Sequence, residues 1–232
     1  MVAIGLERIF RRTGMGASSH LESGGFIRSD VGKRHPDLQY HFLPGSLTGQ
    51  LTPGAYHAMQ AHCSPMRAQS RGWLKLRSSN PRDHPIIEPN YLSVELDLID
   101  MRTGVKLTRE ILEQQTLDAY RGDPISPSKD VQSDAQIDEW IRQNTESAYH
   151  PSCTNRMGVD DNTVVDPQMR VHGLENLRVV DASIMPNIVS GNLNAPTIMI
   201  AEKAADIILG KTPLPRSPAP VYEPKNWEGS QR

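Results

Sequence analysis

Short segments of extended type fill the chain between about residues 21 and 92, and the gaps between them limit how they can pair. Strand candidates lie at 38–42, 56–63 and 72–78. Residues 21–28 are expected to be a loop that enters a short strand, and residues 85–92 an extended segment bounded by prolines. Turn-forming pairs such as Pro53 with Gly54 and Ser64 with Pro65 separate them. A parallel pair needs a crossover of about a dozen residues or more, usually a helix, and these gaps leave no room for one. The spacing therefore predicts an antiparallel sheet.

In the segment 38–42, apolar and polar residues alternate with a period of two, as in a β-strand with one buried face. Leu38, Tyr40 and Phe42 share one face, and His41 projects from the other. On this pattern alone, a solvated strand histidine is the simpler interpretation of His41.

Two helices are predicted between residues 93 and 146. The first covers 93–115, where apolar residues recur at helical spacing and Gly104 is a point at which the helix can bend. Ser133 and Gln136 form a capping box that opens the second. We expect its apolar residues to be core: Ile137, Trp140 and Ile141.

Composition excludes several classes of protein. The 232 residues are 37% hydrophobic and 22% charged, as in a globular protein, and the formal net charge of -2 offers no basic surface to nucleic acid. No run of about 18 apolar residues is present, so no transmembrane segment is expected. Two cysteines, Cys63 and Cys153, cannot build a disulfide framework, and His62 with Cys63 has no partner pair at ligand spacing. We therefore expect a reducing compartment and no metal site.

The first 19 residues contain two patterns with simple interpretations. Residues 1–12 are rich in arginine, but they include Glu7 and lack the apolar core of a signal peptide, so a surface helix is favoured over a presequence. Residues 14–19 look like a dinucleotide-binding turn, but Ser19 stands where the third glycine should be and no strand precedes the turn. We expect an ordinary glycine-containing loop there.

The segments best suited to build a site lie within residues 149–206. His150 occupies a loop before Pro151, and a histidine can accept a proton near neutral pH. A short buried strand at 177–180 ends at Asp181, and a polar loop at 187–194 follows it. Taken alone, a hydrogen-bonded loop histidine is the simpler interpretation of His150. No Gly-x-Ser-x-Gly elbow occurs, which argues against a serine hydrolase.

A helix is predicted from Asn194 to Leu209. Asn194 can cap it, Pro196 suits its first turn, and Gly210 is placed to stop it. The predicted packed face is one stripe: Ile198, Ala201, Ala205 and Ile208. The free N–H groups of the first turn would stabilise a phosphate, an oxyanion or a reduced flavin ring. The residues alone do not choose between these anions.

Three stretches together resemble the signature of the glucose–methanol–choline (GMC) oxidoreductases. They are the His-Pro motif at 150–158, the segment 164–186 and the segment 191–206. Within that family, the chain is most similar to the members that oxidise choline, on the stretches 21–29, 72–78 and 147–154. The resemblance implies FAD as cofactor and oxidation of choline or a similar small alcohol by hydride transfer to the flavin.

The resemblance also implies roles for individual residues. His150 manages the proton of the substrate hydroxyl, and Asn192 occupies the second catalytic position. Glu22 meets the trimethylammonium group, and His41 lines the substrate pocket. The residues that match flavin contacts are Asp181 and Ala182, beside the FAD chain, and Asn194, Ala195, Pro196 and Thr197, beside the isoalloxazine ring.

The expected fold is α+β and has three parts. Residues 1–146 form the substrate-binding region, in which an antiparallel sheet is the floor of the pocket and helices cover its other face. Residues 147–210 carry the catalytic pair and complete the FAD-binding domain of the family, and 211–232 form a proline-rich extended tail. The resemblance further implies a quinone or respiratory chain as electron acceptor, and a mitochondrial location that nothing at this N-terminus encodes.

The family's Gly-x-Gly-x-x-Gly turn has no counterpart here. We therefore expect a C-terminal portion of the family fold without its N-terminal Rossmann-like half, which alone binds FAD weakly and is inactive. Two other interpretations stay open. The chain could belong to a GMC alcohol dehydrogenase with another substrate, or be a catalytically silent interaction module or truncated isoform.

Overall fold

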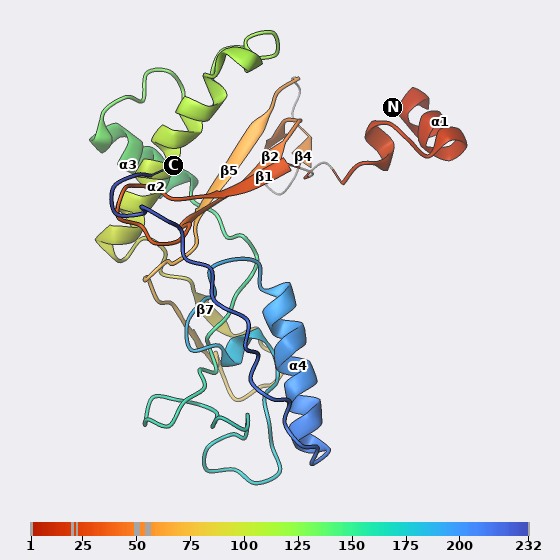
Figure 1. Ribbon diagram of the computed structural model, residues 1–232, viewed down its shortest axis with the longest axis vertical. Coiled ribbons are helices and arrows are strands. Elements are labelled where there is room, and N and C mark those ends of the chain that lie inside the picture. The colour runs from red at the N-terminus through yellow and green to blue at the C-terminus, as the bar shows by residue number, and fades with distance from the viewer. Residues whose placement is uncertain (1, 20, 22, 49–51, 54–56, 232) are drawn as a thin grey trace. The chain divides into compact units, whose positions relative to one another are not determined.

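The computed structural model describes residues 2–19, 21, 23–48, 52–53 and 57–231 (Figure 1). The chain divides into two compact units. The first unit comprises the described residues within 1–65, 99–141 and 226–232. The second unit comprises those within 66–98 and 142–225. Each unit is therefore assembled from segments that are distant in the sequence.

The first unit is built on a three-stranded antiparallel sheet. Its order is β1 (Ser23–Ile27), β2 (Leu38–Leu43) and β5 (Gln60–Pro65) (Figure 1). The short strands β3 (Leu47–Thr48) and β4 (Thr52–Pro53) form a separate antiparallel pair. The predicted antiparallel pairing and the α+β class are confirmed. The strand expected at 56–63 instead occupies 60–65, and residues 54–56 lie outside the described part of the chain.

The helix α2 (Glu95–Leu112) packs against this sheet through its residues in the first unit. Leu107 forms a buried cluster with Leu38 and Tyr40 of β2. The helix continues through Gly104 without the interruption that the sequence allowed. Gly104 serves close packing instead, because a Cβ there would lie 2.7 Å from the Cys63 sulfur atom. The Tyr40 hydroxyl also donates a 3.0 Å hydrogen bond to the Gly104 carbonyl.

The helix α3 (Asp134–Asn144) begins with the predicted capping box. The Gln136 amide donates to Ser133 Oγ at 3.3 Å, and the Ser133 amide donates to Gln136 Oε1 at 2.9 Å. Ile137 and Ile141 are each only 1% exposed, as expected of core residues. Trp140 is half-buried, and its indole N–H donates to Ser126 Oγ at 3.2 Å, because that N–H needs a polar partner.

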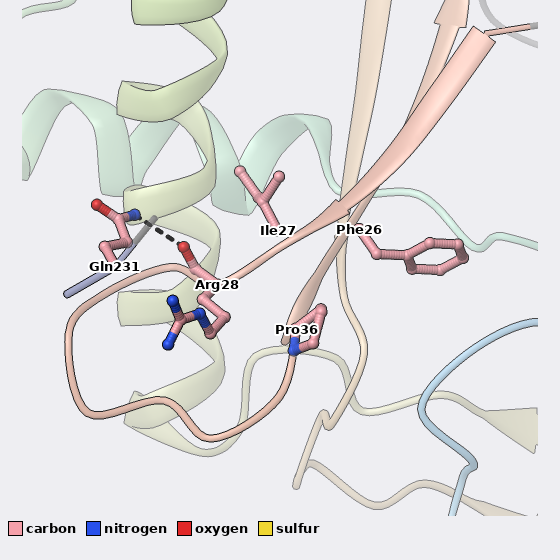
Figure 2. Close-up of a pocket in the computed structure, with 5 residues that line it drawn as sticks. All are labelled: Phe26, Ile27, Arg28, Pro36 and Gln231. Carbon is pink, nitrogen blue, oxygen red and sulfur yellow. Dashed lines mark hydrogen bonds between the residues drawn. The ribbon is translucent and has the colours of Figure 1, made fainter. Parts of the chain in front are cut away.

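The chain ends take two different forms. The helix α1 (Val2–Arg11) contains no buried residue, which confirms the predicted surface helix, and the 3-10 turn η1 (Met15–Ala17) follows it. Residues 211–225 form the predicted tail without regular structure. Gln231 then donates a 2.7 Å hydrogen bond to the Arg28 carbonyl (Figure 2). It also donates a 3.0 Å hydrogen bond to the Ser29 carbonyl. The sequence did not predict this return of the last residues to the first unit.

The second unit combines a hairpin, irregular loops and one long helix. The hairpin pairs β6 (Trp73–Lys75) with β7 (Ile86–Glu88), and the 3-10 turn η3 (Ala182–Ile184) precedes the helix α4 (Asn194–Ile208). A further 3-10 turn, η2 (Gln115–Leu117), belongs to the first unit. The core of the second unit is a buried cluster of Val165, Met169, Ile184 and Ala204.

Two predictions for the second unit are wrong. The strand expected at 177–180 is only an isolated bridge between Arg170 and Arg178, because a short turn segment is its sole partner. The predicted packed stripe of α4 is exposed, with Ile198 at 55% and Ile208 at 58%. Its neighbours Ile200, Ala204 and Ile207 pack on the core instead. Both stripes are apolar, so periodicity could not choose between them.

Among the described residues, no helix combines the length and apolar character needed to cross a bilayer.

Candidate functional site

His150 lies in an irregular segment with two unusual backbone conformations. Tyr149, immediately before it, has φ of 59°, and Cys153 has φ of 70°. Positive φ is uncommon for residues other than glycine, and such residues cluster at functional sites. The Tyr149 amide donates to Ser147 Oγ at 2.9 Å. The His150 side chain is exposed, so its ring is available to a ligand.

The segment that follows His150 is fixed to the turn η3 by a series of backbone hydrogen bonds. The amide of Cys153 donates to the Ala182 carbonyl at 3.3 Å. Two residues later, the amide of Asn155 donates to Ser183 at 2.9 Å, and that of Met157 donates to Ile184 at 2.9 Å. The loop that carries His150 is therefore held against the turn that carries Asp181 and Ala182.

Asp181 begins this turn. Its Oδ1 atom accepts a 2.7 Å hydrogen bond from the amide of Ser183, while the Asp181 backbone is extended. The Ser183 hydroxyl in turn accepts a 2.9 Å hydrogen bond from the Asn155 side chain. The Asp181 residue is exposed and Ala182 is half-buried. The carboxylate thus has a structural role as the cap of η3 and stays accessible to a ligand.

Asn192 lies in the loop before α4, and its side chain is exposed. The predicted cap at Asn194 is wrong. Leu193 occupies the N-cap position, without a side-chain cap hydrogen bond, and its carbonyl accepts from both the amide (3.0 Å) and the hydroxyl (2.7 Å) of Thr197. Asn194 is therefore already the first helical residue, and a capping side chain would have to precede it.

The first turn of α4 presents few backbone donors. Pro196 lies in it as predicted and has no N–H to lose. The amides of Asn194 and Ala195 have no partner within the helix because of their position. Since the partial positive charge of a helix is concentrated at its first turn, this end favours a negatively charged group.

Of the two substrate-binding residues expected from the resemblance, His41 belongs to the first unit. His41 lies on β2, is half-buried, and is directly opposite His62 of β5. Glu22 lies outside the described residues. The sequence does not predict this pairing of His41 with His62, because the register of β2 with β5 cannot be read from the two segments separately.

Comparison with known proteins identifies the family. The family model described as GMC oxidoreductase matches residues 68–201, which is more than half of the chain. The chain belongs to the GMC oxidoreductase family. This region includes His150, Asp181, Asn192 and the first turn of α4.

Two curated GMC relatives align with almost the whole chain. Choline dehydrogenase, mitochondrial, of Homo sapiens is 58% identical over 97% of this chain and 38% of its own length. Oxygen-dependent choline dehydrogenase of Pseudomonas fluorescens (strain SBW25) is 55% identical over 95% of this chain and 39% of its own length. The chain therefore spans well under half the length of these relatives.

Solved structures of GMC proteins share the fold. Pyridoxine 4-oxidase from Mesorbium loti matches with a TM-score of 0.77 and 28% identity, over 84% of this chain and 39% of that protein. An FAD-dependent oxidoreductase from Chaetomium thermophilum matches with a TM-score of 0.64 over 76% of this chain and 28% of that protein. At 24% identity, the second match shows the fold alone.

Proposed function

We propose that this chain supplies the substrate-binding and proton-handling residues of an FAD-dependent choline dehydrogenase, which oxidises choline to betaine aldehyde. The observation that carries the proposal is the 58% and 55% identity, over 95% or more of the chain, to two proteins named as choline dehydrogenases. The exposed side chains of His150 and Asn192 support it, since a substrate can reach both.

His150 is proposed to hold or accept the proton of the substrate hydroxyl. An imidazole ring nitrogen can accept a proton from a hydroxyl group and hold it, as this role requires. A positioned general base contributes about 10²–10⁴ in rate. The hydrogen bonds that fix residues 153–157 to η3 would limit the movement of His150 relative to Asp181. Asn192 is proposed to donate a hydrogen bond to the developing alkoxide without adding a charge.

The residues of the second unit fit a flavin cofactor in their chemistry. The first turn of α4, at Asn194, Ala195, Pro196 and Thr197, would lie beside the isoalloxazine ring, where its partial positive charge favours an anion. The exposed Asp181, with Ala182, would contact the FAD chain. When bound, FAD would supply the hydride acceptor.

The proposed substrate class depends on how the positive charge of choline would be bound. Choline carries a permanent cation that cannot donate a hydrogen bond, so a carboxylate and aromatic faces are suited to bind it. Glu22 is proposed as that carboxylate, and His41 as a residue that lines the substrate pocket. Another alcohol is the second candidate, since pyridoxine 4-oxidase shares the fold at 28% identity.

The electron acceptor and the location are further proposals. A quinone or the respiratory chain is proposed as acceptor, by analogy with dehydrogenases of the family. A mitochondrial location rests on the name of the human relative, and the bacterial relative of similar identity does not support it.

Anaerobic flavin reduction tests the proposed function. The test uses this chain within a full-length, FAD-loaded protein, because the chain alone is expected to bind FAD weakly. That protein is mixed with choline or with its uncharged carbon isostere, 3,3-dimethylbutan-1-ol, and bleaching of the oxidised flavin is followed. Choline should reduce the flavin, and His150→Gln should slow the limiting rate by about 10²–10⁴. Glu22→Gln should weaken binding of choline much more than binding of the isostere. Equal effects of Glu22→Gln on both alcohols would contradict a choline-specific site.

A further inference from the structure

The sheet of the first unit has two chemically different faces. On β2, Leu38 and Tyr40 are buried on the face that packs against Leu107 of α2. Successive side chains of a strand point to opposite faces, so Gln39 and His41 project from the open face. On β5, Cys63 belongs to the helix face, where its sulfur atom lies against Gly104. Its neighbour His62 therefore projects from the open face as well.

His41 and His62 are direct neighbours across the antiparallel pair of β2 and β5. The register pairs His41 with His62. Side chains directly opposite each other have Cβ atoms about 4.5–5.5 Å apart. His41 is half-buried and His62 is exposed, so the pair borders solvent. The two imidazole rings thus form one surface on the open face.

The other flank of His41 carries no side chain. The register of β1 with β2 places Gly24 opposite His41. A Cβ at residue 24 would lie 2.5 Å from the Tyr40 carbonyl oxygen, so the close approach of the two strands requires glycine there. A ligand that reaches His41 can therefore lie over Gly24 while it contacts His62 on the opposite side.

His41 and His62 are the titratable side chains on the open face of this sheet, among the described residues of its three strands. Among the described residues of β1, β2 and β5, the titratable side chains are Tyr40, His41, His62 and Cys63. Tyr40 and Cys63 belong to the face covered by α2, which leaves the two histidines on the open face. Each neutral imidazole offers one donor and one acceptor, and protonation turns it into a cation.

We propose that His62 is a second substrate-contacting residue, and that the His41–His62 pair makes binding of a cationic alcohol dependent on pH. The proposal rests on the proposed role of His41 in the substrate pocket. Neutral imidazoles can lie beside a trimethylammonium group without electrostatic cost. An imidazolium repels it, because like charges at a few ångströms in a partly desolvated site oppose each other. Affinity for choline should therefore fall as the pair becomes protonated, while affinity for an uncharged alcohol should not.

The test measures binding separately from chemistry. In the full-length, FAD-loaded protein, the dependence of the flavin reduction rate on alcohol concentration gives Kd and the limiting rate. The variants are His62→Gln and, as a matched control, His84→Gln, since His84 is an exposed histidine in the loop between β6 and β7. Choline and 3,3-dimethylbutan-1-ol are compared from about pH 8 to about pH 5.5, the range in which histidines titrate.

For the wild-type protein, we expect the Kd of choline to rise about tenfold as pH falls through this range, with little change for the isostere. His62→Gln should raise the Kd of choline about threefold at the upper pH and reduce its rise at the lower pH, with a limiting rate within about twofold of wild type. His84→Gln should behave as wild type. Flavin content and thermal unfolding of each variant check that the fold is retained.

A second measurement uses Ni²⁺ as a probe of the pair. Imidazole is a good ligand for Ni²⁺, and two opposed histidines can chelate the ion. Ni²⁺ should weaken choline binding in the wild type and in His84→Gln, and His62→Gln should remove most of this effect.

The possible outcomes separate the two proposals. If His62→Gln matches the wild type in Kd, in pH dependence and in its response to Ni²⁺, the role of His62 is overturned. If only the isostere reduces the flavin, the choline assignment fails. The contact with His62 must then appear as an altered Kd for the isostere, and an unaltered value overturns it. If neither alcohol reduces the flavin, both proposals are overturned.

Discussion

Gly104 of α2 faces Cys63 of β5 so closely that a Cβ at residue 104 would lie 2.7 Å from the thiol sulfur. The close packing of this helix on the sheet therefore depends on the absence of one side chain. We expect Gly104→Ala to destabilise the protein by about 1–2 kcal/mol, since overpacking outweighs the gain in helix propensity. Thermal or denaturant unfolding measures the loss.

The double variant Cys63→Ala with Gly104→Ala isolates the cause of that loss. Removing the sulfur frees the space that the new Cβ needs, so the double variant should be more stable than Gly104→Ala alone. A double variant as unstable as the sum of the two single changes would show that the strain lies elsewhere along the helix.

Burial raises the pKa of the Cys63 thiol to about 11, with the hydrogen bond to Tyr40 acting in the opposite direction. An unfolded thiol ionises near the ordinary value of 9.0. The unfolded state therefore loses its proton first as pH rises. The stabilising contribution is complete below about pH 9 and is lost progressively towards about pH 11, with a total of roughly 2–3 kcal/mol.

Two measurements check this prediction. The free energy of unfolding should fall more steeply between about pH 9 and about pH 11 in the wild type than in Cys63→Ala. At neutral pH, Cys63 should react with a thiol reagent more slowly than a free cysteine, because only the thiolate reacts. Rapid modification of Cys63 in the folded protein would contradict the burial that raises its pKa.

Arg102 of α2 forms a two-point ion pair with Asp138 of α3. Nε donates to Oδ1 at 2.6 Å and Nη2 donates to Oδ2 at 2.5 Å, with both side chains about a fifth exposed. Asp138→Asn should lower the free energy of unfolding by about 1 kcal/mol. Asp134→Asn is the matched control, because Asp134 is an exposed partner of the same arginine and should matter less. Equal losses for both variants would mean that the geometry of the pair is unimportant.

Replacing Asn192 by a charged side chain tests its proposed role as a hydrogen-bond donor to the alkoxide. Asn192→Asp should slow flavin reduction by choline by about 10²–10³, because a carboxylate would oppose the alkoxide that forms. Asn192→His should retain more activity, since it can still donate a hydrogen bond. Asn192 is exposed, so neither change should alter thermal unfolding by much. Full activity of Asn192→Asp would remove Asn192 from the proposed site.

Local signals in the sequence predicted several features correctly. The spacing of the turns predicted antiparallel pairing, Ser133 with Gln136 predicted the start of α3, and Gly210 was placed to end α4. The helix ends at Ile208, and Gly210 has φ of 66° with its amide bonded to the Ile207 carbonyl at 3.2 Å. These features depend on residues a few positions apart, so a single sequence contains their full physical cause.

Other features depend on tertiary contacts that the sequence does not encode locally. The packed face of α4 is chosen by the cluster around Val165, since both candidate stripes are apolar. The pairing of His41 with His62 depends on a register that no turn motif fixes. The return of Gln231 to Arg28 joins residues 203 positions apart. The roles of the expected site residues and the three-part division at residues 146 and 210 stay predictions.

The backbone hydrogen bonds from residues 153, 155 and 157 to residues 182, 183 and 184 also limit which positions can be varied when the protein is redesigned. Two peptide segments locked together in this way behave as one mechanical part, so a change in either would shift the other. A library of variants in this region should therefore keep both segments intact.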